Sequence, residues 1–343
     1  MADLSVVPFE GTDEEWDRLH EPWEGSTFCH LAGWRRIIGN AFGHEARYRV
    51  AVDEQGVVHG VHPLMRVRSR LFGDYLLSMP FLNYGGPLGS DEAREALGRD
   101  AAREAEAAGV DLLELRSREA VPGDLRTTSR KLTVLLDLPD DPETLFKKGL
   151  KAKVRSQVRR PQKEGLTVRF GLELVQPFYE VFSRTMRDLG TPTLPRRFFD
   201  EIVSVLPEQA MIAVVEKDGE AMAAGFGFLW KGEFEITWAG ALREYSRMAP
   251  NMLLYWGFME ESIRRGAHTF NFGRCSPDSG THRFKKQWGG SDFPLPWAQW
   301  SKGGVDATPN PSGRKYQLAT AAWRRLPVPV ANFLGPFLAR SLP

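Results

Sequence analysis

Two stretches of the sequence share one pattern, YRVAVDEQGVVHGVHPLMRV at residues 48–67 and MIAVVEKDGEAMAAGFGFLW at residues 211–230. In each, an apolar run meets a charged turn that ends in glycine, residues 53–56 in the first and 216–219 in the second, and a second apolar run follows. This pattern predicts a β-hairpin in each stretch. The predicted strands are residues 48–52, 57–67, 211–215 and 221–230.

The order of signals after each hairpin is also repeated: a further strand, a helix, a glycine and a last strand. The first helix is expected at residues 91–108, capped by Ser90 or Asp91 and ended by Gly109. The second is expected at residues 251–265, ended by Gly266. The last strands are expected at residues 110–115 and 267–272. A repeated order of hairpin, strand, helix and strand predicts two tandem α/β domains.

The composition is that of an ordinary globular protein. Of 343 residues, 45 are Lys or Arg and 44 are Asp or Glu, which gives a formal net charge of +1. Because the chain is nearly neutral, contact with a polyanion requires a local basic patch. Cys29 and Cys275 lack the spacing of a disulfide framework or zinc site, and the N-terminus lacks the features of a signal peptide. We therefore expect a cytoplasmic protein without a spanning helix.

The segment after the first half is unusually basic. We expect one helix over residues 143–164, after a turn rich in Pro and Asp. Apolar residues spaced by four predict a stripe that docks on the protein: Phe146, Leu150, Val154 and Val158. Cations with the same spacing form an adjacent stripe: Lys147, Lys151, Arg155, Arg159 and Lys163. Because like charges at this spacing repel, we expect compensation by acids elsewhere in the fold or, as we favour, by a phosphate-bearing ligand.

The expected division of the chain is a domain at residues 1–137, a second domain at 138–302 that includes the basic helix, and a tail at 303–343. The end of the tail alternates apolar residues with prolines and is too short and broken to span a bilayer. We favour packing of the tail on the second domain. A contact with a membrane surface, helped by Arg324 and Arg325, is the alternative.

The densest polar stretch, residues 271–290, follows the last strand of the second half. Open α/β sheets bind ligands at the carboxyl ends of central strands, so we expect a binding loop here. Its candidate groups are three cations, three hydroxyls and a carboxylate: Arg274, Lys285, Lys286, Ser276, Ser279, Thr281 and Asp278. A decorated surface loop is the alternative, because loops are polar in any case.

The strand at residues 233–238 offers a second candidate site. Alternation predicts a polar and an apolar face, with Glu233, Glu235 and Thr237 on the first and Phe234, Ile236 and Trp238 on the second. Glu235 lies deeper in the strand, and a carboxylate on a partly buried strand can have a raised pKa and act as a base. Pairing of Glu235 with the basic helix or with Arg274 is an equally physical alternative.

Several catalytic signatures are missing from the sequence. It contains no Gly-x-x-x-x-Gly-Lys-Ser/Thr, Gly-x-Gly-x-x-Gly, His-Glu-x-x-His or Gly-x-Ser-x-Gly motif. Nucleotide hydrolysis, dinucleotide redox chemistry, zinc proteolysis and serine hydrolysis therefore lose support. The seven His residues lack the spacing of metal ligands, so we expect no metal.

Four segments point to a family: KAKVRSQVRR at residues 151–160, TMRDLGTP at 185–192, NMLLYW at 251–256, and the polar stretch at 271–290. Together they resemble the Fem-type (FemAB-like) aminoacyl/acyltransferases, and specifically the branch associated with bacterial PEP-CTERM and exopolysaccharide systems. The resemblance extends over about residues 20–300. It implies an α/β (α+β) fold of two tandem GNAT-like domains, each a mixed, mainly antiparallel sheet flanked by helices.

The resemblance also implies an activity, the transfer of an acyl or aminoacyl group to an amine of a cell-envelope glycan or peptidoglycan-type precursor. Some relatives use aminoacyl-tRNA and others use acyl-CoA. The second domain would hold the reaction centre, because Phe284, Lys285 and Lys286 match the family's Phe-Lys motif near the acceptor and the transferred group. In some relatives the region of the basic helix carries a coiled-coil arm for tRNA, for which this chain has no room.

Two turns bear on the acyl donor. GNAT enzymes usually hold the CoA pyrophosphate on backbone N–H groups of a glycine-rich turn that opens a helix. In the second half this turn, residues 240–250, has no glycine after Gly240, so the cradle is missing or replaced by Arg243 and Arg247. The first half has a glycine-rich turn at residues 84–89, an anion nest or, as we favour, a structural bend. We expect no tightly bound cofactor, and acyl-CoA or aminoacyl-tRNA as co-substrate.

The expected mechanism is attack of a neutral acceptor amine on an activated acyl carbonyl, in a cleft of the second domain beside the interdomain groove. Glu235 or Asp278 would orient or deprotonate the amine, and Lys285 or Lys286 would stabilise negative charge with Arg274. Tyr84 and Trp238 would line the acceptor groove. The other candidates for substrate binding are Arg187, Asn251, Tyr255, Asn271, Ser276 and Thr281. Those for the anionic groups of the donor are Lys151, Arg155, Arg159, Arg243 and Arg247.

The expected partners are a small-molecule or lipid-linked envelope precursor, with tRNA and a membrane surface as further candidates. A different class of function uses the same basic helix. In that alternative the chain is a non-catalytic tandem GNAT-like module that binds an anionic glycan or a nucleic acid.

Overall fold

The computed structural model describes residues 4–69, 72–304 and 314–341, so residues 305–313 and 342–343 of the expected tail lie outside it. The chain separates into two compact units. Unit 1 comprises Met1–Lys131, Pro294–Pro309 and Ser341–Pro343, and unit 2 comprises Leu132–Phe293 and Asn310–Arg340.

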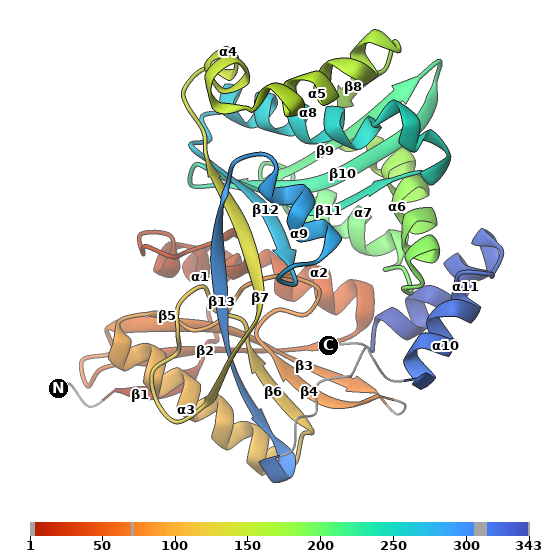
Figure 1. Cartoon of the computed structure of the whole chain (residues 1–343). Coiled ribbons are helices and arrows are strands. Elements are labelled where there is room, and N and C mark those ends of the chain that lie inside the picture. Colours follow the sequence, from red (N-terminus) through yellow and green to blue (C-terminus); the bar gives the residue numbers. More distant parts are fainter. Residues whose placement is uncertain (1–3, 70–71, 305–313, 342–343) are drawn as a thin grey trace. The chain divides into compact units, whose positions relative to one another are not determined.

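The sheet of unit 1 has the strand order β1-β2-β3-β4-β6-β13, with the short β5 paired to β3 (Figure 1). Only the β4/β6 pair is parallel among these. The strands are β1 (Ser5–Pro8), β2 (Glu45–Val52), β3 (Val58–Ser69), β4 (Gly73–Leu77), β5 (Leu88–Gly89), β6 (Leu112–Leu115) and β13 (Ser291–Ser301). The helices are α1 (Asp13–His20), α2 (Gly33–Phe42) and α3 (Asp91–Ala108).

The sheet of unit 2 has the order β7-β12-β11-β10-β9-β8, and here the β11/β12 pair is parallel. The strands are β7 (Arg126–Asp137), β8 (Thr167–Phe170), β9 (Ala210–Lys217), β10 (Glu220–Trp230), β11 (Glu233–Ala241) and β12 (Thr269–Cys275). The helices are α4 (Pro142–Thr144), α5 (Ala152–Lys163), α6 (Val175–Leu189), α7 (Arg196–Val205), α8 (Pro250–Arg264), α9 (Gly280–Lys286), α10 (Arg314–Trp323) and α11 (Val328–Ala339).

The two units therefore repeat one topology, a mixed and mainly antiparallel sheet flanked by helices, which confirms the predicted fold. Their sixth strands are exchanged along the sequence. β13 follows α9 but pairs with β6 of unit 1, and β7 follows β6 but pairs with β12 of unit 2. The expected boundaries at residues 137/138 and 302/303 need correction for this reason, because residues 294–301 belong to unit 1 and residues 132–137 to unit 2.

Local signals account for the repeated elements. The second hairpin turns at Asp218 and Gly219, which both have positive φ, 53° and 80°, as a type I′ turn requires. Helix α3 begins after Ser90, whose hydroxyl accepts from the Ala93 N–H, and ends at Gly109 in the left-handed region. Both hairpins and the helix at residues 91–108 are thus confirmed.

Helices cover both faces of the unit 2 sheet (Figure 1). Gly225 of β10 faces Phe258 of α8, whereas its neighbour Phe226 packs on Phe178 of α6. A β-bulge in β11 lets Trp238 pair with Phe226, while Ile236 pairs with Gly227. The predicted alternation is therefore wrong for Trp238, because the extra residue of the bulge moves this ring to the α6 face, opposite Ile236.

The basic segment is not one helix, which corrects the expectation for residues 143–164. Residues Leu145–Gly149 form a π-helical turn closed by a bond from the Leu150 N–H to the Leu145 carbonyl. Leu150 and Lys151 are then extended before α5 begins at Ala152. The apolar stripe still docks as predicted, with Leu150, Val154 and Val158 buried in the core of unit 2 and Phe146 packed against it.

The described part of the tail packs on unit 2. Arg187 of α6 donates to the Leu326 carbonyl at 2.8 Å, and Arg324 donates to the Leu189 carbonyl at 3.2 Å. Asn332 of α11 donates to the Ser183 hydroxyl at 3.2 Å. Residues 314–340 thus lie with unit 2, the part of the chain on which the tail is expected to pack.

Candidate functional site

The candidate site begins where the parallel strands β11 and β12 separate. In the described part of the two strands, the last rung of the ladder joins Glu235 to Asn271. Beyond it β11 bulges next to Ile236, and β12 turns at Gly273, whose φ is 68°. Strands that separate leave backbone groups without ladder partners, so other polar groups must satisfy them.

A chain of buried hydrogen bonds lies at this opening. Asn271 is completely buried and donates from Nδ2 to Glu235 Oε2 at 3.1 Å and to Glu233 Oε1 at 2.8 Å. Its Oδ1 accepts from the Gly273 N–H at 2.9 Å and from the Thr133 hydroxyl of β7. The network fixes the Glu235 carboxylate, which is only 1% exposed.

Lys285 of α9 reaches β12 at the same place. Ser279 caps the short helix, because its hydroxyl accepts from the backbone N–H three residues later. The Lys285 side chain is 3% exposed, and its ammonium donates to the carbonyl oxygens of Gly273 at 2.5 Å and Arg274 at 3.0 Å. An ammonium has three donors, so one N–H of Lys285 has no acceptor within the part of the chain that the structure describes.

The electrostatic state of Lys285 is unusual. Burial lowers its pKa from the usual 10.5 to about 8, against opposing effects of the Cys275 thiol and the Glu235 carboxylate. Among the described residues no carboxylate contacts the ammonium directly. A buried cation without an ion-pair partner costs stability, and strongly shifted pKa values of this kind concentrate at functional sites.

An aromatic group packs around α9. Tyr255 of α8 lies 4.9 Å from Phe284, 5.9 Å from Phe272 and 6.3 Å from Trp288, measured between ring centroids. Burial raises the pKa of Tyr255, so its phenol stays protonated. These rings hold α9, the helix that carries Lys285, against α8.

Lys286 has other partners. Its ammonium donates to the Gly290 carbonyl at 2.9 Å and lies 3.2 Å from Asp292, which also pairs with His282 Nε2 at 3.0 Å. His282 Nδ1 accepts from the Asp278 N–H, and the His282 and Lys286 contacts hold the pKa of Asp292 low. These contacts tie the loop together, and Asp278 lies at its exposed turn.

The remaining candidates in unit 2 are dispersed. Trp238 lies in an aromatic cluster with Phe198, Phe199 and Phe226 rather than along a groove. Arg187 is engaged with the tail and with Asp188. Of the others, Arg274 and Thr281 are exposed, and Asn251 and Ser276 are half-buried. The structure thus brings together Glu235, Asn271 and Lys285, and it adds Thr133, whose only sequence signal is a hydroxyl inside an apolar strand.

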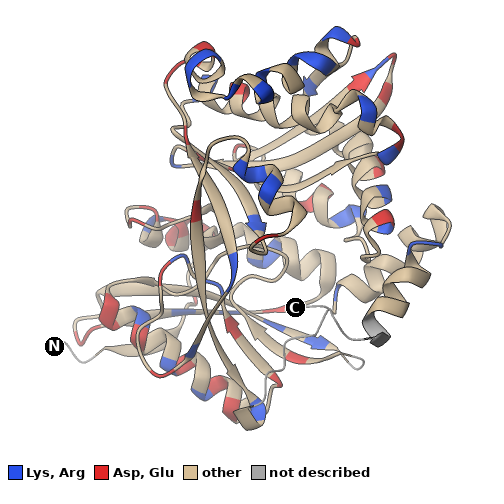
Figure 2. Cartoon of the chain, in the orientation of Figure 1, with Lys and Arg blue, Asp and Glu red and all other residues tan. Residues whose placement is uncertain are grey.

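Basic residues gather along α5 (Figure 2), and most cations of this segment lack a carboxylate partner among the described residues. Glu143 pairs with Lys147, whereas Arg155 donates to the backbone carbonyls of Lys147 and Leu150 and Arg159 lies over the Phe146 ring at 5.2 Å. Within the part of the chain that the structure describes, no carboxylate pairs with the other cations of this segment. They are Lys148, Lys151, Lys153, Arg160 and Lys163, all exposed.

The turn before α8 offers few backbone donors. It is a 3₁₀ helix, Arg243–Met248, followed by Ala249 in the left-handed region and Pro250. A proline at the first helical position has no N–H to give to an anion. Arg243 donates to the Asp188 carbonyl at 3.1 Å, and Arg247 is exposed, so side chains rather than glycine amides present positive charge here.

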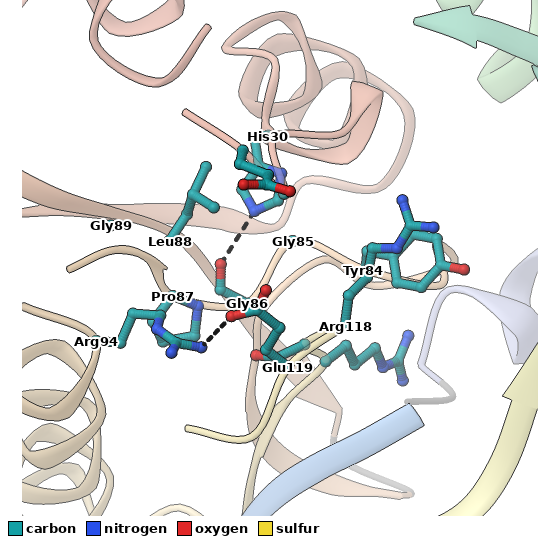
Figure 3. A pocket seen from close by; sticks show the side chains of 14 residues that line it. His30, Tyr84, Gly85, Gly86, Pro87, Leu88, Gly89, Arg94, Arg118 and Glu119 are labelled. Atoms are coloured by element: carbon teal, nitrogen blue, oxygen red, sulfur yellow. Dashed lines mark hydrogen bonds and ion pairs between the residues drawn. The ribbon is translucent and has the colours of Figure 1, made fainter. Parts of the chain in front are cut away.

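Unit 1 contains a pocket of its own, with an empty volume of about 420 Å³ (Figure 3). The glycine-rich turn at residues 84–89 forms one wall, and His30, Arg94, Arg116, Ser117 and Arg118 contribute the main polar groups. The Arg118 guanidinium lies over the Tyr84 ring at 5.1 Å. The Ser117 side chain is 5% exposed, and its hydroxyl has no hydrogen-bond partner among the described residues.

The charges around this pocket are mostly paired. Arg116 donates to Glu114 at 2.7 Å, and both side chains are buried. Arg94 pairs with Asp91 and Glu119. Burial lowers the pKa of His30 to about 3, so the neutral ring donates from Nε2 to the Gly86 carbonyl at 3.1 Å. The His30 bond to Gly86 thus holds the turn in place, and among the described lining residues Arg94 Nε and the Ser117 hydroxyl are buried without a hydrogen-bond partner.

The described residues contain neither a metal site nor a membrane-spanning helix. No group of three or more His, Cys, Asp or Glu residues is placed to hold a metal ion. No helix in the same residues combines the length and apolarity needed to cross a membrane.

A family model and several solved structures are similar to parts or most of this chain. Residues 148–286, all in unit 2, match the family described as Acetyltransferase (GNAT) domain. The crystal structure of FemX is similar over 86% of this chain and 97% of its own, with a TM-score of 0.65 and 16% identity. A search of curated proteins finds no match to the sequence.

Two further solved structures are similar. The C-terminal domain of a putative lysylphosphatidylglycerol synthetase from Agrobacterium fabrum matches 90% of this chain and 94% of its own, with a TM-score of 0.56 and 16% identity. A tandem GNAT protein from the clavulanic acid biosynthesis pathway matches 89% and 100%, with a TM-score of 0.56 and 14% identity. The chain thus has a Fem-like, tandem GNAT fold, as the sequence resemblance implied, while the exopolysaccharide branch stays a prediction.

Proposed function

We propose that this chain, which has the tandem GNAT-like fold of acyl- and aminoacyl-transferases, forms an amide by transferring an acyl group to an amine of a cell-envelope precursor. The observation that carries the proposal is Lys285. It is a buried ammonium with a pKa lowered to about 8, bound to two carbonyls of β12 and next to the Glu235 network. Structural lysines are rarely buried without a carboxylate partner.

The reaction assigned to this site is nucleophilic acyl transfer. The nitrogen of a neutral amine attacks the carbonyl carbon of an activated acyl donor, and the carbonyl oxygen becomes a tetrahedral oxyanion. The remaining N–H of Lys285 donates to that oxyanion. When the intermediate collapses, the bond from carbon to the leaving sulfur or oxygen breaks, and the proton lost by the amine goes to the leaving group.

Glu235 has a positioning role in this proposal. Its carboxylate is only 1% exposed and accepts from Asn271 Nδ2 and from the Thr237 hydroxyl, so we assign it no proton transfer with the amine. Its negative charge favours the ammonium form of Lys285, which is the form that stabilises an oxyanion. Asp278, exposed at the turn before α9, remains the candidate that orients the amine.

The donor is proposed to have a polyanionic carrier, because CoA and tRNA share phosphate groups. The exposed cations of the segment at residues 148–163 and Arg247 would bind them. The turn before α8 lacks glycine amides, which favours side-chain recognition over a backbone cradle. Acyl-CoA and aminoacyl-tRNA remain separate arms of the experiment below.

The acceptor is proposed to bind at the unit 1 pocket through Arg118, because the Tyr84 ring beneath this guanidinium is itself buried. The similar proteins named FemX and lysylphosphatidylglycerol synthetase suggest a peptidoglycan-type or lipid-linked envelope precursor as the class of acceptor. A link to exopolysaccharide assembly follows from the sequence resemblance.

The proposal is tested by transfer of labelled acyl groups. The purified full chain is incubated with acetyl-CoA, longer acyl-CoA or aminoacyl-tRNA, each with peptidoglycan precursors and amino-sugar glycans, and label in a stable amide is measured. We expect one donor arm to give amide with the wild type and with Lys286→Met, and not with Lys285→Met.

The uncompensated cations also favour the second candidate, a non-catalytic module that binds an anionic glycan or nucleic acid. Such a module would show polyanion affinity that falls with salt. It would form no amide in any donor arm. Affinity of that kind without turnover would replace the transferase proposal.

A further inference from the structure

Helix α11 buries its small residues and exposes its large ones. Ala331, Gly335 and Ala339, spaced by four, face the protein and are buried. The exposed side chains are Val330 at 41%, Phe333 at 70%, Leu334 at 40% and Phe337 at 61%. A helix that only had to pack on its own domain would show the opposite arrangement.

This orientation is fixed by specific contacts. A Cβ atom at Gly335 would lie 2.9 Å from the Thr193 backbone nitrogen, so only a glycine allows this close approach. Asn332 donates to Ser183, and Arg187 holds the preceding turn through the Leu326 carbonyl. Turning the phenylalanines inward would break these contacts, so the exposed apolar face is a built feature of the helix.

The exposed residues form one continuous stripe. Residues 330, 333, 334 and 337 have the spacing of one helical face, and the Phe333 and Phe337 rings are 5.7 Å apart. Leu318 of α10 adds a further side chain that is 63% exposed. A contiguous apolar stripe of this kind on a protein surface marks an interaction site.

Charge identifies the partner. From residue 307 to the C-terminus the sequence contains five cations and no Asp or Glu, and Figure 2 shows no acidic residue on α10 or α11. Arg324, Arg325 and Arg340 flank an uncharged stretch, residues 326–339, at its two ends. Aromatic and aliphatic side chains between cationic ends suit an anionic lipid surface, where the rings enter the interface and the cations meet the headgroups.

The length of the helix distinguishes lying on a membrane from crossing it. Its 12 residues correspond to about 18 Å at the helical rise, against about 30 Å of hydrocarbon in a bilayer. We propose that α11 is an interfacial anchor that lies on anionic membranes, with Phe333 and Phe337 inserted at the boundary between headgroups and acyl chains. This inference does not depend on the proposed acyl transfer.

The test measures binding of the full chain to vesicles by co-sedimentation. Vesicles of phosphatidylcholine with phosphatidylglycerol should bind the wild type, and phosphatidylcholine alone should bind it at least about tenfold more weakly. The double variant Phe333→Ser/Phe337→Ser should lose at least about tenfold in partitioning onto anionic vesicles. Arg325→Gln should lose about fivefold.

The matched control is Val57→Ser, which removes an exposed apolar side chain of unit 1, 55% exposed, and should bind as the wild type does. Circular dichroism and the Tm confirm that each variant is folded. Equal binding by the double variant, or equal binding to neutral vesicles, overturns the proposal. So does a dimer that is lost in the double variant without any vesicle binding, because a second copy of the chain would then be the occupant of this face.

Discussion

In each unit the two parallel strands separate after their last paired residues, but the residues that follow differ between the units. In unit 1 the last rung of β4/β6 joins Leu77 to Glu114, and in unit 2 the last rung of β11/β12 joins Glu235 to Asn271. Two residues further along the chain stand Arg116, just after the end of β6, and Gly273, within β12. The topologically matching position is thus a large cation in one unit and a residue without a side chain in the other.

This difference decides which cation lies where the parallel strands separate in each unit. In unit 1 Arg116 is paired with Glu114 and donates to the Met79 and Leu82 carbonyls at 3.2 Å and 3.0 Å. In unit 2 the cation arrives from α9 as Lys285, bound to carbonyls alone. A buried cation with its carboxylate is a structural element, whereas one without a carboxylate keeps a donor and a shifted pKa available for chemistry.

The largest effect is expected from removing Arg116, the buried cation of unit 1 that is paired with Glu114. Arg116→Met leaves the buried Glu114 carboxylate without its ion pair, and this should lower the free energy of unfolding by about 3–5 kcal/mol. Chemical denaturation monitored by circular dichroism measures the change. The double variant Arg116→Met/Glu114→Leu should recover most of the loss, because no unpaired charge is left. A single variant as stable as the wild type would contradict a structural role for the pair.

The matching change in unit 2 should affect activity instead. Lys285→Met removes the donor to the oxyanion, and kcat should fall by about 100- to 1,000-fold, the usual effect of deleting one such donor. Stability should change by less than about 1 kcal/mol, because relief of the buried charge is offset by two carbonyls that lose a donor. Transfer rates and denaturation curves of the same preparations measure both quantities.

Lys286→Met is the control for that change. Lys286 is bonded to Gly290 and Asp292 outside the Glu235 network, so kcat should fall by less than about fivefold. If Lys286→Met abolished transfer while Lys285→Met did not, the assignment of the two lysines would be reversed.

The shifted pKa of Lys285 predicts a pH dependence of stability. Because the folded pKa is about 8 and the usual value is 10.5, the unfolded chain binds more protons between these values, and stability rises with pH there. Below pH 8 the buried charge costs about 3 kcal/mol. Between pH 7 and pH 9 the free energy of unfolding of the wild type should rise by roughly 1 kcal/mol relative to that of Lys285→Met, which has no titrating group at this position.

Urea denaturation of both proteins at the two pH values measures this gain. Subtracting the variant removes the titration of every other group. A constant difference between the proteins would show that Lys285 keeps its ordinary pKa in the folded state.

Much of the fold was accessible from the sequence, because its signals are local. Ser90 and Gly109 predict the first and last residues of α3 correctly, and the turns that end in glycine predict both hairpins. The errors involve features without a local signature. The bulge that moves Trp238 to another face and the π-turn that breaks the basic helix depend on packing and pairing with distant strands and helices.

The site was accessible in part. The sequence identifies Glu235 by its place inside a strand, and Asn271 and Lys285 by the polar stretch after the last strand and by the family resemblance, but it cannot show that the three share one network. The partners of Asn271 lie 36 residues away at Glu235 and 138 residues away at Thr133. The strand exchange that brings β7 beside β12 has no periodicity to reveal it, so Thr133 could not be found from sequence.

The smallest expected effect concerns the pocket of unit 1. The Ser117 hydroxyl is buried and has no hydrogen-bond partner among the described residues, so Ser117→Ala removes no hydrogen bond seen there and should change stability by no more than about 0.5 kcal/mol. If the acceptor places a polar group there, its KM should rise by about three- to tenfold with kcat unchanged, because the bond would form in the ground state and the transition state alike. Steady-state kinetics with varied acceptor measure this. A fall in kcat would instead place Ser117 at the reacting atoms, and it would remove the division between a binding unit 1 and a reacting unit 2.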